Sequence, residues 1–159
     1  MNFLSRLFKR SNDPVTCPRC LGKGHVDEND IKRLNKEMQW LPGSCAYCNG
    51  LKTVDAGMMN KVPVDLSYLT TERTATERRK LKSNDKEAMQ RAIDFDTRIA
   101  EYVDQIVQLY FVENLEIEEI AEQLLHPNPF SSTQSSQYQQ AKRNWMDYIA
   151  KVIAVKKRN

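Results

Sequence analysis

The sequence has no apolar run long enough to cross a membrane. No 18 consecutive apolar residues occur, and residues 1–10 lack the apolar run and the small-residue cleavage site of a secretory signal. The chain has 159 residues, 28% of them charged, and a mean hydropathy of -0.65, so it can bury a core in one modest domain or two very small ones. These absences predict a cytoplasmic protein.

Residue types suited to catalysis are also few. Only His25 and His126 can act as bases near neutral pH, and neither belongs to a nucleophile or carboxylate motif. A glycine-rich phosphate loop is absent as well. We therefore expect a binding protein and not an enzyme.

The four cysteines form two C-x-x-C pairs, Cys17 with Cys20 and Cys45 with Cys48, and none is left over. Two sulfurs three positions apart in a tight turn converge on one point, and two such turns supply the four thiolates of a tetrahedral zinc site. Four protein ligands leave no position for water, so the spacing predicts one structural Zn²⁺. A disulfide framework is disfavoured without a secretory signal, and a redox pair needs no second copy.

Glycines follow both cysteine pairs, at Gly22 and Gly24 after the first and at Gly50 after the second. A knuckle turn directs backbone N–H groups at the thiolates and needs a positive φ, which glycine adopts without steric cost. The glycines therefore support the zinc interpretation.

The knuckles resemble the C-x-x-C-x-G-x-G repeat of the cysteine-rich zinc domain of DnaJ-type chaperones. Residues 17–24 match the repeat completely, whereas residues 45–52 end in Lys52 in place of the last glycine. Two repeats in place of the family's four imply one zinc ion and a surface that contacts polypeptides, as in a chaperone-like protein or an adaptor. A J domain is not indicated, because residues 126–128 read His-Pro-Asn in place of His-Pro-Asp.

The layout of knuckle, helical insert, knuckle and further helices also resembles, more loosely, the late-gene antiterminator Q proteins of lambdoid phages. That family binds DNA and RNA polymerase. The resemblance keeps a nucleic-acid-binding, transcription-regulating protein as an alternative to the polypeptide-binding adaptor.

The apolar periodicity predicts a mainly α fold: a small zinc-knuckle module at residues 15–56 with an inserted helix, a linker at 57–73 and a helical bundle at 74–159. The inserted helix is expected over residues 30–41, with Ile31, Leu34, Met38 and Leu41 facing the knuckles and Asp27 or Asn29 as its cap. Thr74 and Asn84 mark helix starts, and a broad apolar face runs from Ala88 to Leu109. A Ser- and Gln-rich connector is expected at 127–137.

Charge is unevenly distributed along the predicted bundle. Residues 99–126 contain seven acidic residues and no Lys or Arg, whereas the following segment is basic. Oppositely charged helices can pair with each other, and a basic end can also contact nucleic acid or an acidic partner. The candidate contacts are Lys142, Arg143, Lys151, Lys156, Lys157 and Arg158.

Residues 1–14 form a short basic amphipathic segment in which Phe3, Leu4, Leu7 and Phe8 share one helical face. Such a segment can lie on an anionic membrane surface or dock on a partner, but is too short to be a stable helix alone. A protein partner is our main expectation. Nucleic acid, peripheral membrane contact through this segment, and self-association through the broad helix face are the alternatives.

Overall fold

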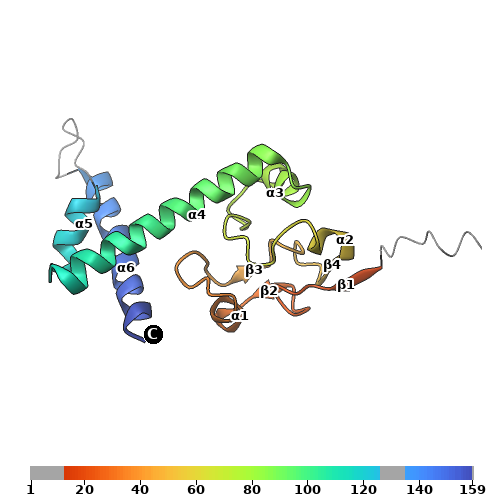
Figure 1. Ribbon diagram of the computed structural model, residues 1–159, viewed down its shortest axis with the longest axis horizontal. Coiled ribbons are helices and arrows are strands. Elements are labelled where there is room, and N and C mark those ends of the chain that lie inside the picture. Colours follow the sequence, from red (N-terminus) through yellow and green to blue (C-terminus); the bar gives the residue numbers. More distant parts are fainter. Residues whose placement is uncertain (1–12, 126–134, 159) are drawn as a thin grey trace, which may run out of the picture. The chain divides into compact units, whose positions relative to one another are not determined.

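The computed structural model describes residues 13–125 and 135–158, and the predicted mainly α fold is confirmed (Figure 1). The chain divides into two compact units, Met1–Asp96 and Thr97–Asn159. No helix in the described residues is long and apolar enough to span a membrane. The elements are β1 (Pro14–Thr16), β2 (His25–Val26), α1 (Glu28–Arg33), β3 (Gly43–Ser44), β4 (Thr53–Asp55), α2 (Ala56–Met59), α3 (Ala75–Lys82), α4 (Lys86–Val107), η2 (Gln108–Val112), α5 (Ile117–Leu125) and α6 (Ser136–Arg158).

Two small antiparallel sheets connect the cysteine pairs of the first unit. β1 pairs with β4, with Val15 opposite Val54, and β2 pairs with β3, with Val26 opposite Gly43. Each knuckle is thus entered by one strand and left by another, and every strand finds its partner at the other knuckle. Strands that pair over only two or three residues give little stability alone. The sheets therefore depend on the cysteine knuckles that the strands enter and leave.

The inserted helix is present but shorter than the sequence predicted. Asp27 caps α1, as expected, and its carboxylate accepts the backbone N–H of Asp30. The helix ends after Arg33 because Asn35 adopts a left-handed conformation (φ 55°) and the amide of Lys36 bonds back to the carbonyl of Ile31.

The apolar residues expected on the inserted helix differ in their burial. Ile31 is buried and Leu34 packs against the same core. Leu41, in contrast, is 74% exposed, so its predicted place on the packing face is wrong. It lies beyond the end of α1, where helical spacing no longer determines which face a side chain joins.

Residues 57–73, expected to be a linker, contribute side chains to the core of the first unit. Val62, Leu66 and Leu69 are buried together with the cysteines, Trp40 and Tyr47. This segment therefore packs on the cysteine knuckles.

The end of the first unit is helical. Thr74 caps α3 through the amide of Glu77, as its sequence predicted. The next helix start, predicted at Asn84, lies one residue later, because Asn84 follows the end of α3 with φ 59° and the carboxylate of Asp85 accepts the amide of Ala88 in α4. The first half of α4 buries Ala88 and Ala92 in the same core as the cysteines. The division between the two units lies within α4, at Asp96.

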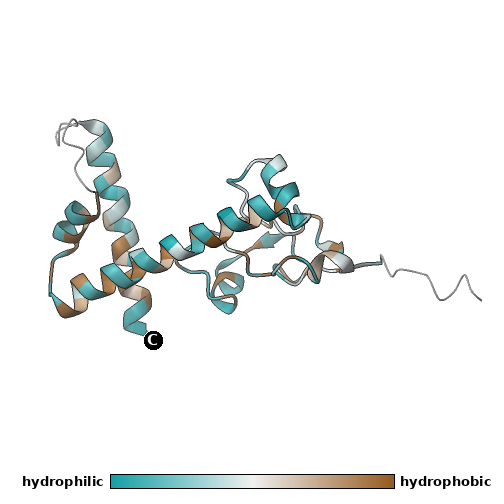
Figure 2. Ribbon diagram, turned by 45° about the horizontal axis from the view of Figure 1, so that its top comes forward, coloured by the Kyte–Doolittle hydropathy of each residue, from teal (hydrophilic) through white to brown (hydrophobic). Residues whose placement is uncertain are grey.

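The second unit comprises the rest of α4, the π-helical turn η2, α5 and α6. Its buried residues come from all of these elements and are Val103, Ile106, Leu109, Ile120, Ala121, Leu124, Ile149, Val152, Ile153 and Val155. Tyr102 and Trp145 meet edge to face with ring centroids 5.0 Å apart. Brown apolar residues alternate with teal polar ones along α4 and α6, as in amphipathic helices (Figure 2).

Candidate metal centre

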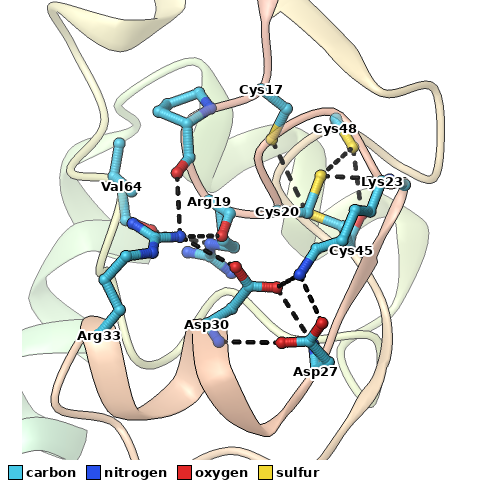
Figure 3. A network of polar contacts seen from close by, with 12 residues as sticks. Cys17, Arg19, Cys20, Lys23, Asp27, Asp30, Arg33, Cys45, Cys48 and Val64 are labelled. Carbon is cyan, nitrogen blue, oxygen red and sulfur yellow. Dashed lines mark hydrogen bonds and ion pairs between the residues drawn. The ribbon is translucent and has the colours of Figure 1, made fainter.

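The four cysteine side chains meet at one buried point of the first unit (Figure 3). The Sγ atoms of Cys17 and Cys45 lie 3.8 Å apart, as do those of Cys20 and Cys48, and all four lie within 4.8 Å of one another. A tetrahedral ion bound by sulfurs at about 2.3 Å has sulfurs about 3.8 Å apart. The cysteines are free thiols, and a disulfide needs its sulfurs at about 2 Å. The cluster thus fits a metal ion and is consistent with zinc.

The two knuckles repeat the same backbone conformation 28 residues apart. The amide of Cys17 bonds to the carbonyl of Lys52 at 2.8 Å, and the amide of Cys45 bonds to that of Gly24 at 3.0 Å. Positive φ angles recur at matching positions, which are Leu21, Gly22 and Gly24 in the first knuckle and Asn49, Gly50 and Lys52 in the second. The predicted role of Gly22, Gly24 and Gly50 is therefore consistent with the structure.

Lys52 stands where the first knuckle has Gly24, and it adopts the same left-handed conformation (φ 70° against 83°). A side chain there carries a steric cost that glycine does not. Gly24 has an additional constraint, since a Cβ at that position would lie 2.8 Å from the carbonyl oxygen of Gly50. The second knuckle therefore has lysine in place of the last glycine of the repeat but keeps the same left-handed backbone conformation at that position.

Arg19 is the main feature of the site that sequence reasoning missed. Although charged, it is 2% exposed, and its guanidinium donates to the carbonyls of Val64 (2.8 Å), Leu69 (2.6 Å) and Leu66 (3.2 Å). It also lies 4.3 Å from the ring centroid of Trp40. Arg19 therefore ties the first knuckle to residues 64–69. Nothing in the local sequence distinguishes it from an exposed arginine.

Burial lowers the pKa of Arg19 to about 10, and the negative charges of Cys45 and Cys17 act against this shift. The side chain therefore stays protonated at neutral pH. A buried guanidinium is costly unless charge and hydrogen bonds compensate it. Thiolates at the cluster supply that charge.

A second polar network fastens α1 to the first knuckle (Figure 3). The buried carboxylate of Asp30 pairs with Lys23 at 2.7 Å and with Arg33 at 3.1 Å. Arg33 also donates to the carbonyl of Arg19 at 2.7 Å. Arg19, directly before Cys20, and Lys23, three residues after it, are thus held by contacts with α1.

The thiols influence one another's ionisation. The hydrogen bond with Cys45 lowers the pKa of Cys17 to about 5, whereas that contact and burial raise the pKa of Cys45. Burial also raises the pKa of Cys20. Four close sulfurs therefore do not all ionise unless a cation compensates their charge, as a bound metal ion does.

The other predicted contact residues are dispersed. Lys142 bridges Glu118 (2.5 Å) and Glu122 (2.7 Å), so the acidic and basic helices α5 and α6 pair with each other. Lys157 donates to the hydroxyl of Tyr110. Arg143, Lys156 and Arg158 are exposed and Lys151 is half-buried along α6. Phe3, Leu4, Leu7, Phe8, the 126–128 tripeptide and most of the 127–137 connector lie outside the described residues.

A cavity of about 310 Å³ lies beside the metal centre, under the exposed Leu41. Val26, Trp40 and Leu69 form apolar parts of its wall. Two of the residues that line it, Gln39 and Thr70, have side-chain oxygens that are buried and have no hydrogen-bond partner among the described residues. Such groups cost free energy until a partner satisfies them.

Comparisons with protein-family models, with curated proteins and with solved structures find no match.

Lys52 and Gly24 occupy matching left-handed positions, and separate substitutions at the two positions should change the free energy of unfolding in opposite directions. Lys52→Gly should raise the free energy of unfolding by about 0.5–1 kcal/mol, because it removes a strained side chain. Gly24→Ala should lower it by about 1–3 kcal/mol, because the new methyl group meets the carbonyl of Gly50. Urea denaturation of the metal-loaded protein measures both, and a shift of the same sign for both would refute the equivalence of the knuckles.

Replacement of Arg19 should weaken metal binding although Arg19 is not a ligand. Arg19→Lys keeps the charge but loses most of the carbonyl bonds, so we expect about 10- to 100-fold lower affinity. Competition with a chromophoric chelator measures this affinity. Arg79→Lys, at an exposed arginine of the same unit, is the control and should leave it unchanged. Equal affinities of all three proteins would show that Arg19 does not support the site.

Proposed function

We propose that Cys17, Cys20, Cys45 and Cys48 hold one Zn²⁺ ion in a structural role, and that the module built around it is a non-enzymatic adaptor that binds other polypeptides. The observation that carries the metal assignment is the 3.8 Å sulfur spacing in both cross-knuckle pairs. Four buried thiolates form a closed, soft ligand set, which suits zinc and leaves no coordination position for a reacting water.

The zinc ion would give the first unit its rigidity. Its core contains the four cysteines and the apolar side chains of residues 62–69, and its sheets have only two or three residues per strand. A module of this kind gains much of its folding free energy from the metal.

The cavity under Leu41 supports binding of a polypeptide. An extended chain offers an apolar side chain for the Trp40 and Leu69 wall. β3, at the rim of the cavity, pairs with β2 alone in its two-stranded sheet, so its other edge has no strand beside it within the described residues. An added strand would pair with that edge, as in other complexes formed by strand addition.

Metal content tests the first part of the proposal. Protein purified under reducing conditions should contain one zinc per chain by elemental mass spectrometry, and the Cys17→Ser/Cys48→Ser variant should contain almost none and melt at a lower temperature. His25→Gln is the control: His25 is exposed on β2, so its loss should leave the zinc content unchanged. Metal-free wild-type protein, or zinc retained by the double variant, would refute the site.

Peptide capture tests the second part. Zinc-loaded protein should select sequences with an apolar anchor from a displayed library of random peptides, and Leu41→Glu should weaken that capture at least about tenfold. Leu51→Glu is the matched control, because Leu51 is 73% exposed against 74% for Leu41 but does not line the cavity. No selected peptide, or equal losses in the two variants, would refute polypeptide binding at the cavity.

A further inference from the structure

Three of the five residues that line a second cavity of the first unit are cationic. The cavity measures about 210 Å³ and is formed by Asn49, Ala75, Arg78, Arg79 and Lys82. Four of these residues belong to α3, and Asn49 follows the last cysteine of the second knuckle. The cavity thus lies between the basic helix and the metal centre.

The cavity wall is held in place from several sides. Lys82 donates to the side-chain oxygen of Asn49 at 3.0 Å, and Asn49 has a left-handed backbone fixed by the knuckle. Arg78 donates to the carbonyls of Thr71 and Arg73. The fully buried Leu81 anchors α3 itself. Arg78 and Lys82 are therefore positioned by contacts with the rest of the unit, and Arg79 lies beside them on α3.

No ion pair in the described structure neutralises this cluster. Among the ion pairs of residues 13–125 and 135–158, none involves Arg78, Arg79 or Lys82. Glu77, the one acid on α3, pairs with Arg91 at 3.0 Å. Burial and the charge of Arg78 both lower the pKa of Lys82, so the cations repel one another.

The metal centre offsets only part of this positive charge. A divalent ion with four thiolates carries a net charge of minus two. The cysteines act favourably on the charges of Arg19 and Lys82, which together carry two positive charges. Arg78 and Arg79 form no ion pair in the described part of the chain.

We propose that this cavity is a binding site for a phosphate group. Arginine side chains bind phosphate oxygens with paired N–H donors, and Lys82 adds a third cation in the same wall. A phosphate offers up to two negative charges and several acceptor oxygens, which matches three converging cations better than a single carboxylate does. The site uses other residues than the cavity under Leu41, so it does not depend on polypeptide binding.

The phosphate can come from a free phosphate compound or from the backbone of a nucleic-acid strand, since both present the same oxygens. Arg79 lines the cavity and is exposed, so an incoming phosphate of either kind can reach it. It is therefore the best position for a test that leaves the fold intact.

The experiment titrates the zinc-loaded full chain with sodium phosphate against sodium chloride at equal ionic strength, and follows the amide resonances of Asn49 and Lys82. Saturable shifts with phosphate alone are expected. Arg79→Gln should weaken the affinity about tenfold, as expected for loss of one charge-assisted hydrogen bond. Lys80→Gln, which removes an equal charge from an exposed position of α3 outside the cavity, should change it less than twofold.

A second arm identifies the source by competition with a short single-stranded oligonucleotide. If the oligonucleotide binds more strongly than inorganic phosphate, and Arg79→Gln again weakens its binding, the site is assigned to a nucleic-acid backbone. If the oligonucleotide binds equally or more weakly, the site is assigned to a free phosphate compound. The proposal is overturned if phosphate causes no saturable shift, or if Arg79→Gln and Lys80→Gln weaken binding equally, since diffuse charge would then explain it. Zinc content of both variants verifies that they are folded.

Discussion

The convergence of four thiolates on one buried point is the constraint on which the first unit depends. The strands that enter and leave the knuckles pair over only two or three residues, and α1 has six. Elements of this size are not stable alone in water. Their sulfurs nevertheless lie within 4.8 Å of one another, a spacing that repulsion between thiolates opposes and a bound cation favours. The metal centre thereby determines where both knuckles, and everything packed on them, are placed.

Arg19 extends this constraint beyond the knuckles. Its charge is compensated by the cluster, while its hydrogen bonds hold the carbonyls of residues 64–69, a segment without regular secondary structure. That segment lines part of the cavity under Leu41, and Trp40, which stacks on Arg19, lines another part. Lys82 of α3 donates to the side chain of Asn49, the residue after the last cysteine of the second knuckle. The two cavities are thus both built on residues that the metal centre positions.

Local sequence rules account for the features that are determined locally. The C-x-x-C spacing predicts the cluster, Asp27 and Thr74 are found as helix caps, and the long apolar stripe gives α4. The rest depends on tertiary packing. Helical spacing placed Leu41 on a buried face because it cannot reveal that Asn35 ends the helix first. Val62, Leu66 and Leu69 are spaced four and three residues apart as on a helix, but the segment forms no helix, so their burial results from tertiary packing and not from a local periodicity. The same holds for Arg19, since arginine is rarely buried.

X-ray absorption at the zinc edge tests the central claim most directly, because it reports the ligands of the bound ion in the intact protein. The account predicts a single shell of four sulfurs at about 2.3 Å and no nitrogen or oxygen ligand. A shell that contains nitrogen or oxygen, or a protein that binds no zinc under reducing conditions, would contradict it.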